Sequence, residues 1–202
     1  MTQLIVVAKE PVPGRVKTRL CPPCTPREAA GIAAAALADT LDALGAVPAV
    51  RRVLLIDGGY PAPPGWTGVP QRGDGLAARL ANGFADTALP GVPSLLVGMD
   101  TPQLTGAVIS AAVAALADAD VVLGPADDGG WWALGLRRPA DAAALRDVPM
   151  STPDTGARTL AAFAGRRVVL LPRMRDVDTM ADAHEVAGLC AAGSRFAAAV
   201  PR

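Results

Sequence analysis

Residues 4–20 read LIVVAKEPVPGRVKTRL, a stretch that joins an apolar segment to a basic loop. The first five residues are continuously apolar and mostly β-branched, as in the buried central strands of parallel sheets. Lys9 then opens a loop that proline and glycine interrupt and that carries four cations within eleven residues. Ligands of open α/β sheets bind outside the carboxyl ends of the strands, so a site is expected at this loop.

Strand-like and helical segments alternate along the rest of the chain. Apolar runs at 53–56, 94–98, 121–123, 131–136 and 168–171 predict strands, and 25–44, 75–88, 105–116, 140–145, 159–163 and 179–189 are expected to be helical. Residues 66–70 make a poor strand. The glycine-rich run at 73–78 therefore lacks the preceding strand that a dinucleotide-binding fingerprint needs. The alternation predicts an α/β fold with a three-layer, doubly wound and mostly parallel sheet, and we expect one domain over residues 1–202.

Composition excludes several classes of partner. The 202 residues include 19 basic and 19 acidic side chains, for a formal net charge of zero. Neutrality argues against nucleic acid or an anionic membrane held by bulk electrostatics. No apolar run approaches the ~18 residues of a membrane span. Three cysteines make an odd count and no disulfide framework, so we expect a cytoplasmic protein, monomeric or homodimeric, with small-molecule partners.

The basic loop predicts a phosphate site. Lys9, Arg15, Lys17 and Arg19 offer charge-assisted hydrogen bonds to phosphate oxygens. A P-loop is rejected, because that motif needs glycine immediately before its lysine and Val16 stands there. The alternative is a solvated basic loop that binds nothing.

Carboxylates that follow two later strands suggest a divalent cation. Asp100 lies at a predicted strand tip within GMDTPQL, residues 98–104, and Mg²⁺ is commonly held by one or two protein carboxylates. Asp176 and Asp178, within RDVDTMAD at 175–182, face the same way and are expected to reach that cation from the opposite side. The alternatives are an ordinary aspartate before a turn at position 100 and helix capping by Asp178 or Thr179.

The segment GPADDGGWW, residues 124–132, suggests a second part of the site. Its paired glycines would let the backbone approach a ligand closely, and Asp128 would orient a hydroxyl, assist the metal or act as a base. Trp131 and Trp132 face opposite ways in a strand, so one is expected to contact a ligand and the other the core. A plain Asp-Gly hairpin turn is the alternative.

Cysteine and histidine give no further site. Cys21 and Cys24 are spaced like a redox or metal pair, but zinc would need two more ligands. Cys190 and His184 lie on a predicted alanine-rich helix, where packing or capping explains them better. Any role of the Cys21/Cys24 pair stays open.

Taken in order, these motifs resemble the glycosyltransferases labelled as radical-SAM/selenodomain-associated transferases. The resemblance spans about residues 3–185. It is carried by Lys9, Pro13-Gly14, Lys17-Thr18-Arg19-Leu20, Gln71-x-Gly73-x-Gly75-Leu76 with Arg79, Gly98-x-Asp100-x-Pro102-x-Leu104, Gly124-Pro125, Asp128-Gly129-Gly130 and Asp176-Val177-Asp178-Thr179-x-x-Asp182. A more distant similarity is to 2-phospholactate guanylyltransferases. Both groups have the GT-A, or nucleotide-diphospho-sugar transferase, fold.

The resemblance implies an NTP or nucleotide-sugar site with Mg²⁺ or Mn²⁺. By it, Asp100 with Asp176 and Asp178 would hold the metal, and Lys17, Arg19 and Asp128 would act in catalysis. The implied nucleotide and phosphate contacts are Ala8, Lys9, Gly14, Arg15, Lys17, Arg19, Gln71, Gly73, Gly75 and Leu76. The expected acceptor pocket comprises Gly129, Gly130, Trp131, Ser151 and Thr152. Trp131-Trp132 and the segment 149–152 depart from the family pattern, so the acceptor is not identified.

The expected function is metal-dependent transfer from an activated nucleotide. The density of cations in the loop suits a triphosphate, which favours nucleotidyl transfer from an NTP to a phosphorylated small-molecule acceptor. The family label favours glycosyl transfer from a nucleotide-sugar. The third possibility is a nucleotide-binding module without catalysis.

Overall fold

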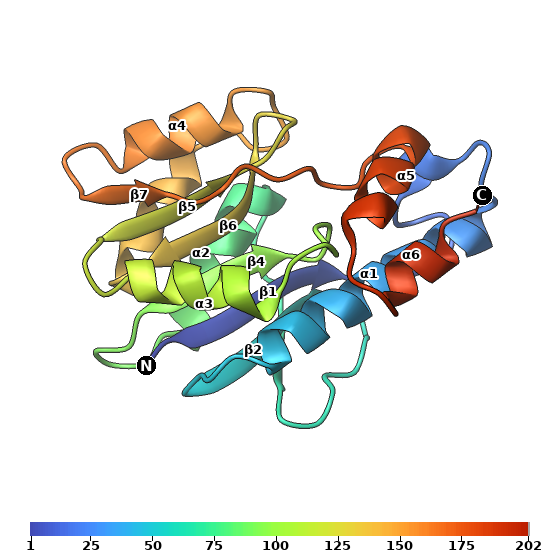
Figure 1. The fold of residues 1–202 in the computed structure, drawn as a ribbon. Coiled ribbons are helices and arrows are strands. Elements are labelled where there is room, and N and C mark those ends of the chain that lie inside the picture. Colours follow the sequence, from blue (N-terminus) through green and yellow to red (C-terminus); the bar gives the residue numbers. More distant parts are fainter. Residues whose placement is uncertain (202) are drawn as a thin grey trace.

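The computed structural model describes residues 1–201, and within them the strands form one seven-stranded sheet of order β3-β2-β1-β4-β6-β5-β7 (Figure 1). Neighbouring strands are parallel except at β6, which is antiparallel to both β4 and β5. The bounds are β1 Gln3–Lys9, β2 Arg51–Asp57, β3 Thr67–Pro70, β4 Ser94–Gly98, β5 Val121–Pro125, β6 Trp131–Leu136 and β7 Val168–Leu170. The predicted mostly parallel α/β sheet is confirmed.

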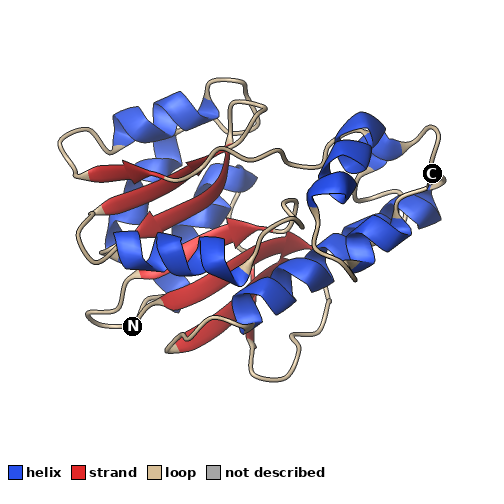
Figure 2. Ribbon diagram, viewed as in Figure 1, coloured by secondary structure: helices blue, strands red, loops and turns tan. Residues whose placement is uncertain are grey.

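Helices cover both faces of the sheet, which gives the three predicted layers (Figure 2). Alternate side chains of β1 serve the two faces: Leu4 and Val6 pack with α1 and α3, and Ile5 packs with α2 and the 3₁₀ helix η2. The helical bounds are η1 Thr18–Leu20, α1 Pro26–Gly45, α2 Gly75–Thr87, α3 Gly106–Ala115, η2 Pro139–Asp147, α4 Thr155–Ala162, α5 Met180–Leu189 and α6 Arg195–Ala199. None of the helices in residues 1–201 has the length and apolar character to cross a membrane.

Helix α1 begins as its sequence predicts. The Thr25 hydroxyl accepts from the backbone N–H of Glu28 at 3.3 Å, and the Glu28 carboxylate accepts from the Thr25 N–H at 2.7 Å. This capping box satisfies two N–H groups that the first helical turn leaves without partners. Gly45 is the last residue of the helix. The cap fixes where the basic loop that follows β1 must end.

Three local predictions differ in detail from the structure, and two short elements were not predicted. Residues 67–70 do form a strand, β3, which pairs in parallel with β2 at the sheet edge, where Pro70 is tolerated. The predicted helix at 159–163 begins earlier, at Thr155, and the one at 140–145 is a 3₁₀ helix. Helix α6 and the short η1 carry too few residues for a periodic signal, and the sequence did not predict them.

Residues 172–178 form an extended strap that crosses from the sheet to α5 (Figure 1). Backbone hydrogen bonds attach it at both ends: Met174 donates to Pro125 at 3.1 Å, and Val177 donates to the Asp100 carbonyl at 3.0 Å. The Thr179 hydroxyl then caps α5, completing a second capping box with Asp182. The strap therefore holds Asp176 and Asp178 against the end of β4.

Candidate nucleotide and metal site

A pocket of about 650 Å³ opens at the carboxyl ends of β1, β2 and β4. The register pairs Lys9 with Asp57 and Val7 with Gly98, so these strands end at one edge. The sequence-predicted residues that line the pocket are Ala8, Lys9, Arg15, Lys17, Arg19, Gln71, Leu76, Asp100, Asp128, Gly130, Trp131, Ser151, Thr152, Asp176 and Asp178. The structure thus brings together residues that lie up to 170 positions apart, from Ala8 to Asp178.

Four predicted glycines lie outside this lining. Gly14, Gly73, Gly75 and Gly129 all have positive φ, a conformation that residues with a side chain rarely adopt. Gly129 also packs its backbone directly on Pro153, and its carbonyl accepts from the Gly156 N–H at 2.8 Å. The close approach expected between this glycine and a ligand is made with another loop of the chain instead.

Lys17 lies between the end of β4 and the strap. Its Nζ is 2.7 Å from Asp100 Oδ1 and donates to the Val177 carbonyl, and its side chain is only 8% exposed. Asp100 Oδ1 is itself buried. Its contact with Lys17 is an ion pair without hydrogen-bond geometry, and Asp100 Oδ1 therefore accepts no hydrogen bond within residues 1–201. Backbone φ at Lys17 is +50°, a left-handed value that only a small fraction of non-glycine residues adopt.

Arg19 pairs with Asp178, another of the predicted metal ligands. Its guanidinium contacts Asp178 Oδ2 in an exposed ion pair. Lys9 and Arg15, by contrast, make no ion pair within residues 1–201 and line the pocket with exposed side chains. The basic loop therefore presents two cations neutralised by carboxylates and two that face the open pocket.

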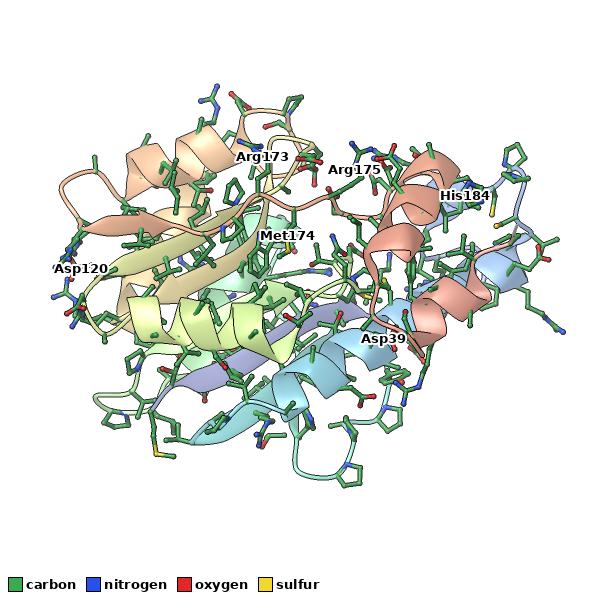
Figure 3. All side chains as sticks on the ribbon, viewed as in Figure 1. Asp39, Asp120, Arg173, Met174, Arg175 and His184 are labelled. Atoms are coloured by element: carbon green, nitrogen blue, oxygen red, sulfur yellow. The ribbon has the colours of Figure 1, made fainter. Side chains whose placement is uncertain are left out.

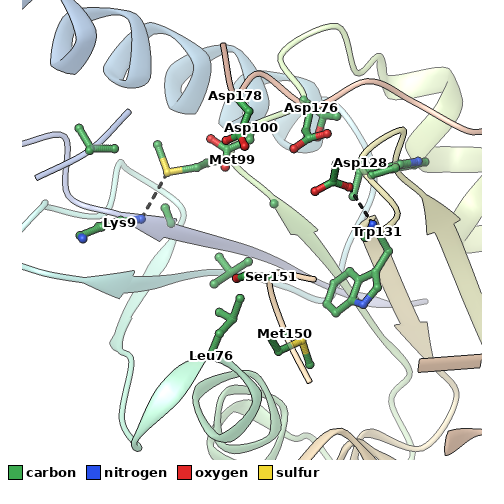
Figure 4. A pocket seen from close by; sticks show the side chains of 18 of the residues that line it. Lys9, Leu76, Met99, Asp100, Asp128, Trp131, Met150, Ser151, Asp176 and Asp178 are labelled. Carbon is green, nitrogen blue, oxygen red and sulfur yellow. Dashed lines mark hydrogen bonds between the residues drawn. The ribbon is translucent and has the colours of Figure 1, made fainter. Parts of the chain in front are cut away.

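Asp176 is the carboxyl whose ionisation the surroundings oppose most. Burial raises its pKa to about 6, with repulsion from Asp128 and then Asp178 adding to the rise, while the Lys17 ammonium opposes it. Figure 4 shows these carboxylates along one wall of the pocket with Asp100, across from Leu76 and Met150. Crowded carboxylates of this kind are stabilised by a cation among them.

The donor set suits Mg²⁺ or Mn²⁺, which prefer oxygen ligands. Asp100 Oδ1 lacks a hydrogen bond, and Asp176 is disfavoured as an anion, so a divalent cation would satisfy both. Within the described residues, no three acidic, histidine or cysteine side chains already form a metal cage. Two of the three predicted ligands, Asp100 and Asp178, are instead held by Lys17 and Arg19.

Asp128 and the two tryptophans line the pocket next to Asp176. Asp128 Oδ1 accepts from the Gly130 N–H at 2.7 Å, which shapes the turn. Trp132 is 2% exposed and donates its Nε1–H to the Pro172 carbonyl at 3.0 Å. Trp131 is half-buried, lines the pocket and donates to Thr159 Oγ1 at 3.1 Å. The two rings therefore have the different environments that strand alternation predicts.

The loop before α4 completes that side of the pocket. Ser151, with φ at +59°, and Lys17 are the two non-glycine residues of the described chain with positive φ, and both line the pocket. Thr155 holds the loop by donating its hydroxyl to the Pro149 carbonyl at 2.9 Å. Met150 adds an apolar contact that the sequence did not single out.

Gln71 and Leu76 lie at the end of the pocket nearest β1 and β2. The Gln71 amide donates to the carbonyls of Ala8, at 2.8 Å, and Leu55, at 3.1 Å, so both of its N–H groups are used by strand backbone. Leu76 is 43% exposed. Arg79 lines the same end and pairs with Asp57 at 2.8 Å, a contact that the sequence analysis did not assign.

Arg175 is a further residue that sequence reasoning missed. It lies on the strap between the sheet and α5 (Figure 3). Its guanidinium reaches Asp127 at 3.4 Å and both Asp182 and Glu185 at 3.2 Å. Its carbonyl accepts from Gln103 Nε2 at 2.7 Å. In the sequence, Arg175 directly precedes Asp176 and is followed by two more aspartates within seven residues. That pattern could have indicated that Arg175 makes ion pairs beside the site.

Residues 40–152 match the family described as "Uncharacterized protein conserved in bacteria (DUF2064)". This chain belongs to the DUF2064 family. The matched part of the DUF2064 chain contains Asp100, Asp128 and the Gln71–Leu76 loop. No curated protein matches the chain.

Solved structures show the fold of this DUF2064 protein. A protein of Desulfovibrio desulfuricans G20, provisionally named a nucleotide-diphospho-sugar transferase, superposes with a TM-score of 0.81 at 25% identity, over 90% of this chain and 85% of that chain. Rv0371c of Mycobacterium tuberculosis H37Rv in complex with manganese gives 0.59 at 19% identity, over 92% and 98%. A CMP:2-keto-3-deoxy-manno-octonic acid synthetase complexed with CTP gives 0.58 at 12% identity, over 92% and 97%. The DUF2064 chain has the nucleotide-diphospho-sugar transferase, or GT-A, fold.

Proposed function

We propose that this protein is a divalent-metal-dependent nucleotidyltransferase that moves NMP from an NTP to a phosphorylated small-molecule acceptor. The observation that carries the proposal is one pocket in which a cation-rich loop meets Asp100, Asp176 and Asp178. The fold supports it, since a neighbour of the same fold is a synthetase with bound CTP. The manganese complex of another neighbour supports a metal in this architecture.

In this proposal the metal ligands are Asp100, Asp176 and Asp178. When bound, Mg²⁺ or Mn²⁺ supplies charge stabilisation and orientation for the phosphates. The exposed Lys9 and Arg15 meet the incoming phosphates, and Lys17 and Arg19 neutralise the pyrophosphate as its charge develops. These are proposed roles, built on side chains that line one pocket.

The base and acceptor are assigned to opposite ends. Leu76 and the Gln71 loop are proposed to lie against base and ribose, while Trp131, Ser151 and Thr152 line the acceptor end with Gly130. An acceptor phosphate oxygen attacks the α-phosphorus, a new P–O bond forms, and the bond to the β-phosphate breaks to release pyrophosphate. Asp128 orients the acceptor beside that reaction.

The test is pyrophosphate release from each NTP with Mg²⁺ and a panel of phosphate monoesters. Release that requires both the monoester and the metal supports the proposal, and Asp100→Asn should abolish it. The matched control is Asp118→Asn, an exposed aspartate outside the pocket lining. Nucleotide binding without any turnover would instead support a non-catalytic module.

Glycosyl transfer is the second candidate. It is favoured by the provisional name of the D. desulfuricans protein, which is 25% identical. In that case Asp128 would take the proton of an acceptor hydroxyl, and the nucleoside diphosphate would leave. Turnover of UDP- or GDP-sugars without pyrophosphate release distinguishes the two reactions.

A further inference from the structure

The two cations assigned to pyrophosphate are already paired with the carboxylates assigned to the metal. Lys17 contacts Asp100 and Arg19 contacts Asp178. The pairs join the basic loop to the end of β4 and to the strap. While these pairs last, each cation neutralises one oxygen of a carboxylate assigned to the metal, and each carboxylate neutralises a cation assigned to the pyrophosphate.

The position of the Lys17 ammonium is that of a cation among oxygen ligands. Nζ contacts Asp100 Oδ1 and the Val177 carbonyl, which lies between Asp176 and Asp178 in sequence. At 8% exposure the ammonium has little water around it and depends on these oxygens. Asp100 Oδ1 has no hydrogen bond to replace that contact within residues 1–201. A metal that takes Asp100 Oδ1 as a ligand must therefore displace Lys17 from that oxygen.

Binding of the metal alone, or of the triphosphate alone, is unfavourable because it breaks the ion pairs and leaves one set of charges without partners. If the metal binds without phosphate, the Lys17 ammonium loses its carboxylate and stays poorly solvated. If a triphosphate draws Lys17 and Arg19 away without metal, Asp100 and Asp178 are left beside Asp176 without their counter-charges. When metal and triphosphate arrive together, each charge exchanges one partner for another and none is left unpaired.

We propose that Lys17 and Arg19 are resident counter-cations of the carboxylate site, so that metal and triphosphate bind cooperatively through exchange of these ion pairs. The proposal rests on the proposed function for the identity of the two ligands. Linkage requires the coupling to be reciprocal: metal strengthens triphosphate binding by the factor by which triphosphate strengthens metal binding.

The experiment measures Mn²⁺ affinity of the full chain by electron paramagnetic resonance of free Mn²⁺, without nucleotide. Lys17→Met and Arg19→Gln should each bind Mn²⁺ alone more tightly, by about tenfold for Lys17→Met, near the lower end of the coupling between close charge pairs. Lys9→Met is the matched control, because Lys9 lines the same pocket but makes no ion pair within residues 1–201. It should change Mn²⁺ affinity by less than about threefold, since its charge acts only through screened solvent. Arg19 is 75% exposed, so Arg19→Gln tests the idea even where the buried substitution disturbs folding.

A second arm titrates inorganic tripolyphosphate with and without Mg²⁺. Wild-type protein should bind it more tightly with Mg²⁺, and Lys17→Met should lose most of that difference. Unchanged or weaker Mn²⁺ binding by both Lys17→Met and Arg19→Gln overturns the exchange while leaving the proposed function standing. Absence of Mn²⁺ binding by every variant, with tripolyphosphate present, overturns both.

Discussion

Asp176→Asn should stabilise the metal-free protein while removing its response to metal. The Asp176 carboxyl is partly buried beside Asp128 and Asp178, and these surroundings raise its pKa from 3.8 to about 6. Asparagine keeps the shape of the side chain and removes the charge. The charge of Asp176 opposes folding, yet the residue lines the pocket. Residues of this kind are retained for function and not for stability.

The magnitude follows from the pKa difference. At about 1.4 kcal/mol per pKa unit, a rise from 3.8 to about 6 corresponds to about 3 kcal/mol. Water reaches part of this half-buried carboxyl, which reduces the expected gain to about 1–2 kcal/mol. Well below pH 3.8 the carboxyl is protonated in both states, so the gain vanishes. It grows as pH rises, because the unfolded chain ionises more readily, and it is complete above about pH 6.

The assay is urea unfolding in EDTA at pH 4, 5, 6, 7 and 8, followed by Mn²⁺ addition at pH 7. Asp118→Asn is the matched control, since Asp118 is exposed outside the pocket lining and its neutralisation should bring no comparable gain. Mn²⁺ should raise the unfolding free energy of the wild type and leave Asp176→Asn unchanged. Equal stability of variant and wild type at pH 8, or a gain at pH 4 as large as that at pH 8, would refute the reasoning.

Three other substitutions test the site and its scaffold. Asp100→Asn should abolish the metal dependence of nucleotide binding, and an unchanged Mn²⁺ titration would contradict its role as a ligand. Lys17→Ala should weaken NTP binding by about 1.5–3 kcal/mol more than NMP binding, which is the free energy of one lost charged hydrogen bond. Calorimetric titration with Mg²⁺ present measures both affinities, and equal weakening of the two would count against a phosphate contact. Gly129→Ala should destabilise by more than about 2 kcal/mol, because its φ is +89° and the added Cβ would meet the Pro153 carbonyl. Gly14→Ala is its control, with positive φ but open space around the Cβ, and should cost about 1 kcal/mol in urea unfolding; similar losses would show that the Pro153 contact is unimportant.

Local pattern was sufficient for most of the fold. The apolar run of β1, the capping boxes at Thr25 and Thr179, and the strands at 94–98 and 131–136 are each encoded by neighbouring residues. The order of strands and helices then restricts the topology to a doubly wound sheet, and the carboxyl ends of its strands are where ligands bind. The candidate side chains of the pocket follow from that order.

What each charge contacts was decided only by the tertiary structure. Lys17 and Val177 are 160 positions apart, and Arg19 and Asp178 are 159 apart. No local periodicity carries such pairings, since they depend on how the strap lies across the end of β4. The same is true of β3, whose weak sequence becomes a strand because β2 offers it an edge. The sequence alone thus specified which residues supply the cations and the carboxylates. Folding decided which cation pairs with which carboxylate, because opposite charges that are brought together in a pocket stabilise each other's ionised forms.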